Sequence, residues 1–530
     1  MIHQFTNNDY HIVMDVGSGA VHAVDRLVYD AVALMAAEVA DMETPAPLDE
    51  RVTGRVADAL AGTVGFPAGT YTREDIQDAL AQIQGLIDMG QLFVKDTYEG
   101  YVRDFKARKT VVKALCLHVA HDCNLACRYC FAEEGEYHGR RALMGAEVGK
   151  KALDFLVVHS GNRKNLEVDF FGGEPLMNWG VVKELVAYGR SLEGPHGKRF
   201  RFTLTTNGVL LDDEVTQFCN REMANVVLSL DGRKGVNDRM RPMRGGQGSY
   251  DRIVPRFRSF VAQRGSRSHF LRGTFTRHNL DFSQDILHFL DLGFTKLSME
   301  PVVAADAADA AIGCSETCAL GEPKGGGVDS YHASRPGGQA AVGNAGASAD
   351  TGNAAGGDGC AGTSDGYALR EEDLPAILAE YDRLARIYLE RRAEGRGFEF
   401  FHFNIDLTGG PCVAKRMAGC GAGTEYLAVT PWGDLYPCHQ FVGREDYLLG
   451  NVEDGITRPD ICDTFKYCNV YAKEDCRGCF ARFYCSGGCA ANAQQFGGDI
   501  HGTYRLGCEM QKKRVECALM IQAALAGGAA

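Results

Sequence analysis

Residues 111–303 alternate between short apolar runs and longer segments with helical periodicity. The apolar runs predict six strands, at 111–120, 166–171, 201–206, 225–230, 269–276 and 295–303. Helices are expected between them, for example at 147–160 and 249–263. Six strand–helix units in a row predict an α/β fold with a parallel sheet. A partial (β/α)6 barrel fits better than a dinucleotide fold, because no glycine fingerprint follows the first strand.

The first 100 residues have a different pattern and predict a small α/β unit. Residues 11–24 indicate a hairpin of two short strands, 26–42 a helix, and 91–94 another short strand. A second helix is expected at 71–90, where Thr72 and Asp75 resemble a capping box and Gly90 ends the periodic pattern.

Beyond the barrel, composition separates three further regions. We place the barrel at 108–303, a disordered insertion at 304–366, a helical linker at 367–408 and a cysteine-rich region at 409–530. The insertion is rich in Gly and Ala and has almost no large apolar side chains. It cannot bury enough surface to offset the entropy of ordering it.

The overall charge and the absence of long apolar runs exclude some function classes. A net charge of −13 argues against a nucleic-acid binder that works through phosphate contacts. The sequence contains no run of eighteen or more apolar residues, so it predicts no membrane span. Its first residues do not resemble a signal peptide. We therefore expect a cytoplasmic protein. In a cytoplasmic protein, 19 cysteines indicate metal or redox chemistry rather than disulfides.

Three cysteines follow the end of the first barrel strand. Cys123, Cys127 and Cys130 have the spacing C-x3-C-x2-C, at the strand end where barrels place their chemistry. A structural zinc ion usually takes four protein ligands, and neither His121 nor His138 is well placed to be the fourth. A [4Fe–4S] cluster held by three thiolates would instead leave one iron open to a ligand that is not protein.

This cysteine spacing resembles that of radical S-adenosylmethionine (SAM) enzymes. The resemblance implies that SAM is the fourth ligand and that Tyr129 packs near its adenine. Motifs at the next strand ends, GGEP at 172–175, TTNG at 205–208 and SLDG at 229–232, occur in the order found in the family. The resemblance implies that SAM is bound by Gly172, Gly173, Glu174, Thr206, Asn207, Ser229 and Asp231, with Arg272 as a weaker candidate.

The C-terminal cysteines resemble the seven-cysteine SPASM pattern of radical SAM enzymes. By this resemblance a first auxiliary [4Fe–4S] cluster would be held by Cys420, Cys438 and Cys489. A second would be held by Cys476, Cys479, Cys485 and Cys508. The first set lacks one protein ligand, which Cys412 could supply, or the site could stay open for a substrate thiolate. Three [4Fe–4S] clusters are therefore expected in all.

Two further stretches, 8–30 and 410–441, resemble the maturases of SCIFF peptides, whose short substrates are dense in cysteine. The resemblance implies that residues 1–100 are a winged-helix-like domain that binds a leader peptide along a sheet edge. A simple capping domain is the alternative. The expected partners are a cysteine-rich precursor peptide with a leader, and an electron donor such as ferredoxin or flavodoxin.

The function implied is the formation of thioether cross-links in a ribosomally made peptide by way of a 5′-deoxyadenosyl radical. The chemistry would belong to the cofactor, and the protein would supply placement and the exclusion of water. One alternative is a sulfatase maturase, which oxidises a single Cys or Ser. Another is an iron–sulfur electron carrier without catalytic activity, which would have no use for SAM motifs at the strand ends.

Overall fold

The structure is a computed structural model that describes residues 1–39, 50–63, 71–102, 110–137, 139, 141–303, 366–405, 407 and 413–527. The predicted insertion therefore lies outside the described residues except for residue 366, and so do His138 and Cys412.

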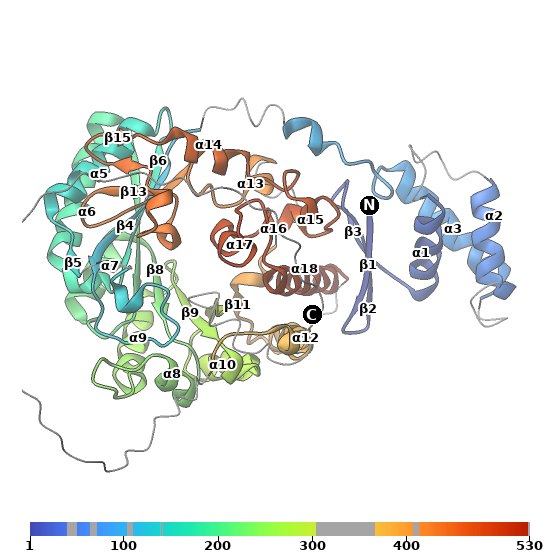
Figure 1. The fold of residues 1–530 in the computed structure, drawn as a ribbon. Helices are drawn as coiled ribbons and strands as arrows, with labels where there is room; N and C mark the ends of the chain where they lie inside the picture. The colour runs from blue at the N-terminus through green and yellow to red at the C-terminus, as the bar shows by residue number, and fades with distance from the viewer. Residues whose placement is uncertain are drawn as a thin grey trace, which may run out of the picture. The chain divides into compact units, whose positions relative to one another are not determined.

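The N-terminal unit is a three-stranded antiparallel sheet with three helices (Figure 1). Its elements are β1 (Ile2–Asn7), β2 (Tyr10–Asp15), β3 (Val21–Val24), α1 (Arg26–Val39), α2 (Glu50–Asp58) and α3 (Arg73–Asp88). The hairpin and both predicted helices are confirmed, and α3 has the capping box between Thr72 and Asp75. The strand expected at 91–94 is wrong: Phe93 has φ +56°, and the N–H of Val94 bonds the Asp15 carboxylate instead of a strand.

All six predicted barrel strands are present and lie parallel in the order in which they occur in the sequence. They are β4 (Ala114–His121), β6 (Asn165–Gly172), β7 (Arg199–Thr206), β8 (Met223–Ser229), β9 (Phe270–Phe275) and β10 (Lys296–Pro301). The helices between them are α5 (Ala146–His159), α6 (Trp179–His196), α7 (Asp213–Glu222), α8 (Lys234–Met240), α9 (Tyr250–Arg264) and α10 (Phe282–Asp291). Large apolar residues such as Phe170, Phe202 and Phe257 fill the space between the sheet and these helices.

The C-terminal region continues the barrel sheet at both ends. β12 (Tyr426–Val429) pairs in parallel with β4, and β11 (Glu399–Phe400) pairs in parallel with β10. β13 (Asp434–Tyr436), β14 (Gly450–Asn451) and β15 (Gly455–Ile456) extend the sheet beyond β12, and the short strand β5 (Ala142–Leu143) pairs with β4. The remaining helices are α12 (Leu374–Ala393), α13 (Val413–Ala418), α14 (Pro459–Tyr467), α15 (Glu474–Arg477), α16 (Arg482–Cys485), α17 (Ala490–Gly497) and α18 (Arg505–Ala526).

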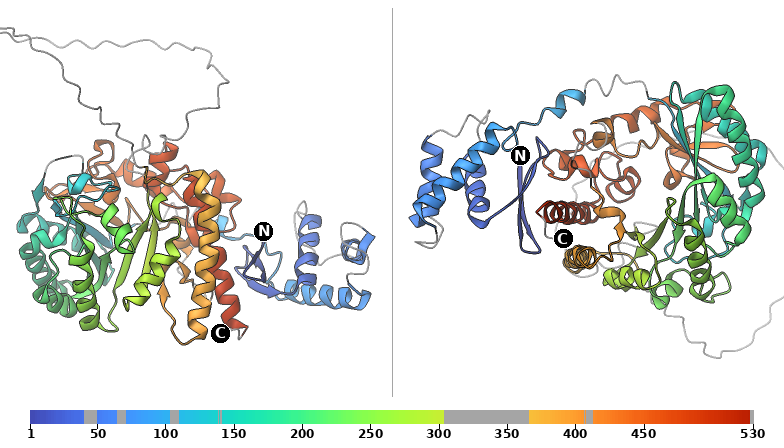
Figure 2. Two further views of the ribbon diagram at one scale, coloured as in Figure 1. Left: turned by 90° about the horizontal axis from the view of Figure 1, so that it is seen from below. Right: turned by 180° about the vertical axis from the view of Figure 1, so that it is seen from behind.

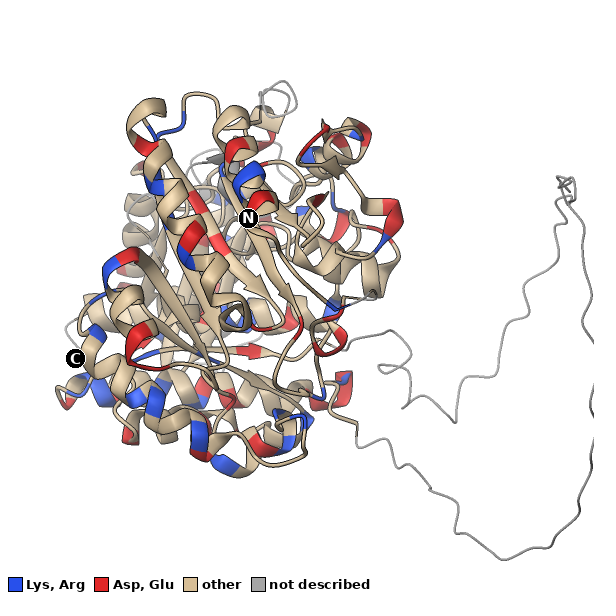
Figure 3. Ribbon diagram, turned by 90° about the vertical axis from the view of Figure 1, so that its left-hand side faces the viewer, with Lys and Arg blue, Asp and Glu red and all other residues tan. Residues whose placement is uncertain are grey.

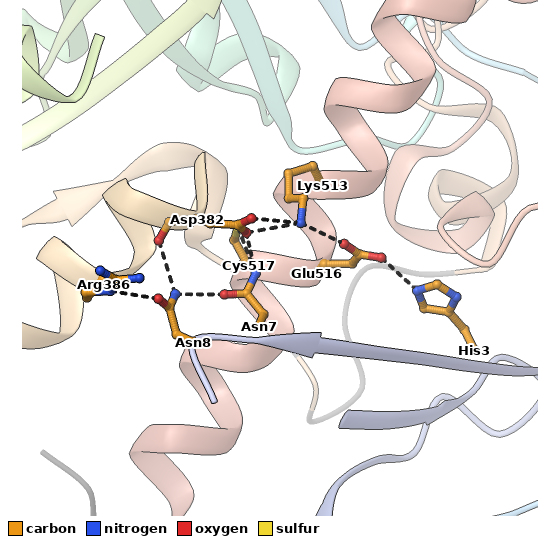
Figure 4. Close-up of polar contacts among 8 residues, drawn as sticks. All are labelled: His3, Asn7, Asn8, Asp382, Arg386, Lys513, Glu516 and Cys517. Atoms are coloured by element: carbon orange, nitrogen blue, oxygen red, sulfur yellow. Dashed lines mark hydrogen bonds and ion pairs between the residues drawn. The ribbon is translucent and has the colours of Figure 1, made fainter. Parts of the chain in front are cut away.

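Helices α12 and α18 run side by side, and the N-terminal sheet packs against α18 (Figure 2). Polar contacts join the first strand to both helices (Figure 4). His3 Nε2 lies 3.0 Å from Glu516 Oε1, and Asn7 Nδ2 donates to Asp382 Oδ1 over 2.6 Å. Lys513 of α18 lies 3.1 Å from the same Asp382 carboxylate. These contacts fix the sheet at the C-terminal helices.

Charged residues of both signs are interspersed along the outer helices on the face drawn in Figure 3. Among the described residues, no helix is both long and apolar enough to cross a membrane.

Candidate cofactor site at the carboxyl ends of the barrel strands

The loop that carries Cys123, Cys127 and Cys130 is held by a second loop that follows α8. Leu125 forms an antiparallel bridge with Met243. The N–H groups of Ala126 and Arg128 donate to the carbonyls of Pro242 and Met240, each over 2.9 Å. These main-chain bonds fix the conformation of the loop, and all three cysteines line one cavity at the ends of the strands.

Glu174 connects the ends of β6 and β7. Its side chain is buried, and Oε1 accepts a hydrogen bond from Thr206 Oγ1 over 2.8 Å while Oε2 accepts one from the Asn207 N–H over 2.8 Å. Burial raises the pKa of this carboxyl, and the hydrogen bonds from Asn207, Leu176 and Thr206 oppose that rise. Both carboxylate oxygens of Glu174 therefore accept hydrogen bonds from within the protein, and this side chain joins the GGEP segment to the TTNG segment.

The two glycines of GGEP allow the strand end to approach the cysteine loop closely. Gly172 has φ +121°, and a Cβ added there would lie 2.2 Å from the Ala120 carbonyl oxygen. A Cβ on Gly173 would lie 2.2 Å from the Asp122 carbonyl oxygen. No side chain fits at either position, so the close packing of main chain on main chain requires glycine.

A buried polar group links the cysteine loop to β8. The Tyr129 hydroxyl donates to Asp231 Oδ2 over 2.7 Å and accepts from Arg241 Nη1 over 2.9 Å. Burial raises the pKa of the Asp231 carboxyl, and the Arg241 guanidinium opposes that rise. Arg241 lines the same cavity as the cysteines, and its Nε is buried with no hydrogen-bond partner among the described residues.

Arg241 is a candidate functional residue that the sequence analysis missed. A single arginine in the loop between α8 and α9 carries no periodic or spacing signal. In the structure it is the positively charged side chain on the wall of the cysteine-lined cavity, and its free Nε could bond an anionic group. It would suit the carboxylate of SAM, the ligand implied by the sequence resemblance.

We predict that Arg241→Met raises the KM for SAM by on the order of tenfold or more, because it removes a buried cation and leaves Asp231 without its counter-charge. The rate of 5′-deoxyadenosine formation against SAM concentration measures this effect. Arg252→Met, on the exposed face of α9, is the matched control and should leave the KM unchanged. An unchanged KM in the Arg241 variant would exclude this role.

The structure brings most of the predicted site residues together. The cavity is lined by the three cysteines with Tyr129, Gly172, Gly173, Glu174, Thr206, Asn207 and Ser229. Asp231 reaches the cavity through Tyr129. Arg272 is not among the lining residues: its side chain is 51% exposed, and its Nε lies 3.9 Å from Glu300 Oε1.

The donor set of this cavity, three thiols, fits the three thiolates that a [4Fe–4S] cluster with one open iron would take. Burial raises the pKa of the Cys123 thiol to about 11 and that of Cys127 to about 12, so both thiols need a bound metal to lose their protons near neutral pH. Among the described residues, no three Cys, His, Asp or Glu side chains converge as ligands of one metal ion would. Thiolates that each bind a different iron need not converge in this way.

The C-terminal cysteines gather in two places. Cys476, Cys479, Cys485 and Cys508 line one cavity of about 340 Å³, as a shared ligand set would. Burial raises the pKa of the Cys438 thiol, and the neighbouring Cys489 and Cys420 thiols raise it further. The sequence resemblance assigns these two groups of cysteines to two auxiliary clusters, and that role stays a prediction.

Comparisons with known proteins agree with this geometry. The Radical SAM superfamily model matches residues 117–267. The cyclopropyl synthase TigE of Paramaledivibacter caminithermalis, itself a radical SAM enzyme, is 25% identical over 131 residues, 23% of this chain and only 27% of that protein. An uncharacterized protein of Archaeoglobus fulgidus is 24% identical over 393 residues, 72% of this chain and 74% of that protein.

Among solved structures, anSMEcpe with bound AdoMet has a similar fold. The TM-score is 0.58 at 17% identity, and the match covers 78% of this chain and 95% of that chain. The cysteine loop, the motifs at the strand ends and the family match all fall on the same part of the barrel. Residues 117–267 therefore form a radical SAM domain.

Proposed function

We propose that this protein is a radical SAM enzyme that forms thioether bonds, from cysteine sulfur to carbon, within a ribosomally made, cysteine-rich peptide. One observation carries the peptide assignment: a small sheet, whose two edges pair with no other described strand, is attached to a barrel that gathers three cysteines at its strand ends. An extended peptide can add to such an edge through main-chain hydrogen bonds.

The direction of the main-chain groups in this sheet supports such docking. The Asp15 N–H donates to the Ala20 carbonyl over 2.9 Å, so these opposite residues form a hydrogen-bonded pair. Along an antiparallel hairpin, such pairs alternate with pairs whose N–H and C=O groups point away from the partner strand. By this alternation, Val21 and Ala23 of β3 direct their N–H and C=O groups away from β2. Among the described residues, neither β1 nor β3 pairs with a further strand. Ala23 is also exposed, so the β3 edge is accessible to a peptide at this position.

A solved structure with a related fold supports a peptide substrate. The structure of anSMEcpe with AdoMet also contains a bound peptide, Kp18Cys, and has a TM-score of 0.55 at 16% identity. The N-terminal sheet favours a cross-linking enzyme over a sulfatase-maturase-like oxidation, because a short peptide with a leader needs a separate place to dock.

Each group of residues has a distinct part in this proposal. Cys123, Cys127 and Cys130 would hold the [4Fe–4S] cluster that, with an outside electron donor, supplies the electron for cleaving SAM to methionine and a 5′-deoxyadenosyl radical. Arg241 and the glycine-rich strand end would orient SAM. The two C-terminal cysteine sets would hold auxiliary clusters that bind the substrate thiolate or accept the surplus electron.

Coexpression with a candidate cysteine-rich precursor peptide, followed by mass spectrometry, tests the proposal. We expect the peptide to lose two hydrogens per bridge, and each bridged cysteine to resist alkylation. Oxidation of one Cys or Ser without a bridge would support the sulfatase-maturase-like alternative. A protein that forms no 5′-deoxyadenosine with SAM and reductant would instead be an electron carrier.

A further inference from the structure

A cavity of about 780 Å³ lies between the N-terminal sheet, the segment that follows β11 and the C-terminal helices. We call it the seam groove. Its lining is largely apolar and aromatic, and includes Tyr98, Phe401, Ile405, Phe483, Tyr484 and Val515. Phe401 is 54% exposed in this concave wall. A concave apolar surface of this kind suits a ligand with apolar side chains.

One end of the seam groove is the turn between β2 and β3. Ser18 and Gly19 of this turn line the cavity, and β3 begins two residues after Gly19. A leader strand added to the β3 edge would therefore meet the groove at the start of β3. Because a leader precedes its core peptide, the added strand must run antiparallel to β3 for the following residues to enter the groove.

The segment that follows β11 forms another wall of the groove and contacts the last barrel strand. His402 lines the groove, and its Nε2 lies 3.0 Å from Glu300 Oε1 of β10. Glu300 lies 3.9 Å from Arg272, which pairs in register with Ser229 on the adjacent strand. Ser229 lines the cysteine cavity. One row of side chains on neighbouring elements therefore joins the groove to the cofactor site.

The groove also passes the C-terminal cysteines. Cys420 and Cys485, one from each expected auxiliary ligand set, are both lining residues, and Cys420 is exposed. A peptide lying in the groove would thus contact one cysteine of each set.

We propose that the seam groove binds the segment of the precursor peptide that links the leader to the cysteine-rich core, in an extended conformation with apolar side chains on the groove wall. The inference rests on the function proposed above. It adds a second binding site between the leader edge and the radical site, and it fixes the direction in which the peptide runs. Selection would then depend on apolar residues in the linking segment as well as on the leader.

The test uses the full-length enzyme and the precursor peptide that it modifies in the coexpression experiment. Phe401→Lys places a charge on the apolar wall and should raise the KM for this peptide by on the order of tenfold. Val158→Lys, a 74% exposed position on α5, is the matched control and should leave the KM unchanged. Benzoylphenylalanine at position 401 should cross-link on irradiation to residues between leader and core, whereas the same group at position 158 should not.

The outcomes separate this inference from the proposed function. If the enzyme modifies the peptide but Phe401→Lys leaves its KM unchanged, or if position 401 cross-links only outside the linking segment, the groove assignment is overturned while the function stands. If the wild-type enzyme leaves the peptide unmodified, the proposed function is contradicted, and the groove assignment falls with it.

Discussion

Replacement of Cys123, Cys127 and Cys130 together with Ala is expected to reduce 5′-deoxyadenosine formation to background while the iron at the C-terminal cysteines is retained. The three thiols line one cavity, and in the described structure they are separate from the cavity formed by Cys476, Cys479, Cys485 and Cys508. Anaerobic incubation with SAM and dithionite, followed by chromatography and iron analysis, measures both effects.

Cys462→Ala is the matched control for this variant, because Cys462 is a partly buried thiol on α14 with no assigned ligand role. It should keep full activity and full iron content. If the triple variant still cleaves SAM, these cysteines do not hold the catalytic cluster. If it loses all of its iron, the two C-terminal sets are not independent sites.

A substitution on the β3 edge of the N-terminal sheet is expected to weaken binding of the leader peptide. Ala23→Pro removes one outward-facing N–H of β3 and adds a ring on the open edge, without removing a hydrogen bond to β2. We expect it to weaken binding of a fluorescent leader peptide by on the order of tenfold, since the N–H bond is lost and the ring obstructs the incoming strand. Fluorescence anisotropy with the full-length enzyme measures the affinity.

Thr6→Pro is the matched control on the opposite edge. By the same alternation the N–H of Thr6 faces away from β2, and Thr6 is exposed like Ala23. This variant should bind the leader as the wild type does. Equal affinities for all three proteins would rule out docking on either edge, and a loss confined to Thr6→Pro would move the docking site to β1.

The barrel strands that the sequence predicted correctly have either a continuous apolar run or apolar residues at every second position. β4 is buried along its whole length, whereas β6, β7 and β9 alternate buried positions with more exposed ones. β1 was missed because IHQFTN mixes polar and apolar residues. The turn that pairs β1 with β2 places Asn8 and Asp9 at φ +46° and +68°, a conformation that these residue types tolerate. The failed strand at 91–94 has an apolar sequence, but its main chain is held by the Asp15 side chain.

The site was predictable to the extent that its residues lie at the ends of predictable strands. Parallel strands bring their carboxyl ends to one edge, so motifs scattered over more than 100 residues meet around the cysteine loop. The partner of each side chain was not predictable in the same way. The sequence could not reveal that both Glu174 oxygens accept bonds from Thr206 and Asn207, that Arg272 lies beside Glu300, or that Arg241 lines the cavity. These contacts depend on the tertiary packing of loops.

In the proposed reaction a hydrogen atom leaves a carbon of the peptide, and a cysteine sulfur takes its place. It is tested most directly with a precursor peptide whose non-cysteine residues carry deuterium on carbon, incubated anaerobically with the enzyme, SAM and reductant. We expect 5′-deoxyadenosine to gain one deuterium for each thioether bridge formed. For each bridge the peptide should lose one deuterium from carbon and one proton from a thiol. Bridged or oxidised peptide accompanied by 5′-deoxyadenosine without deuterium would contradict the proposed reaction.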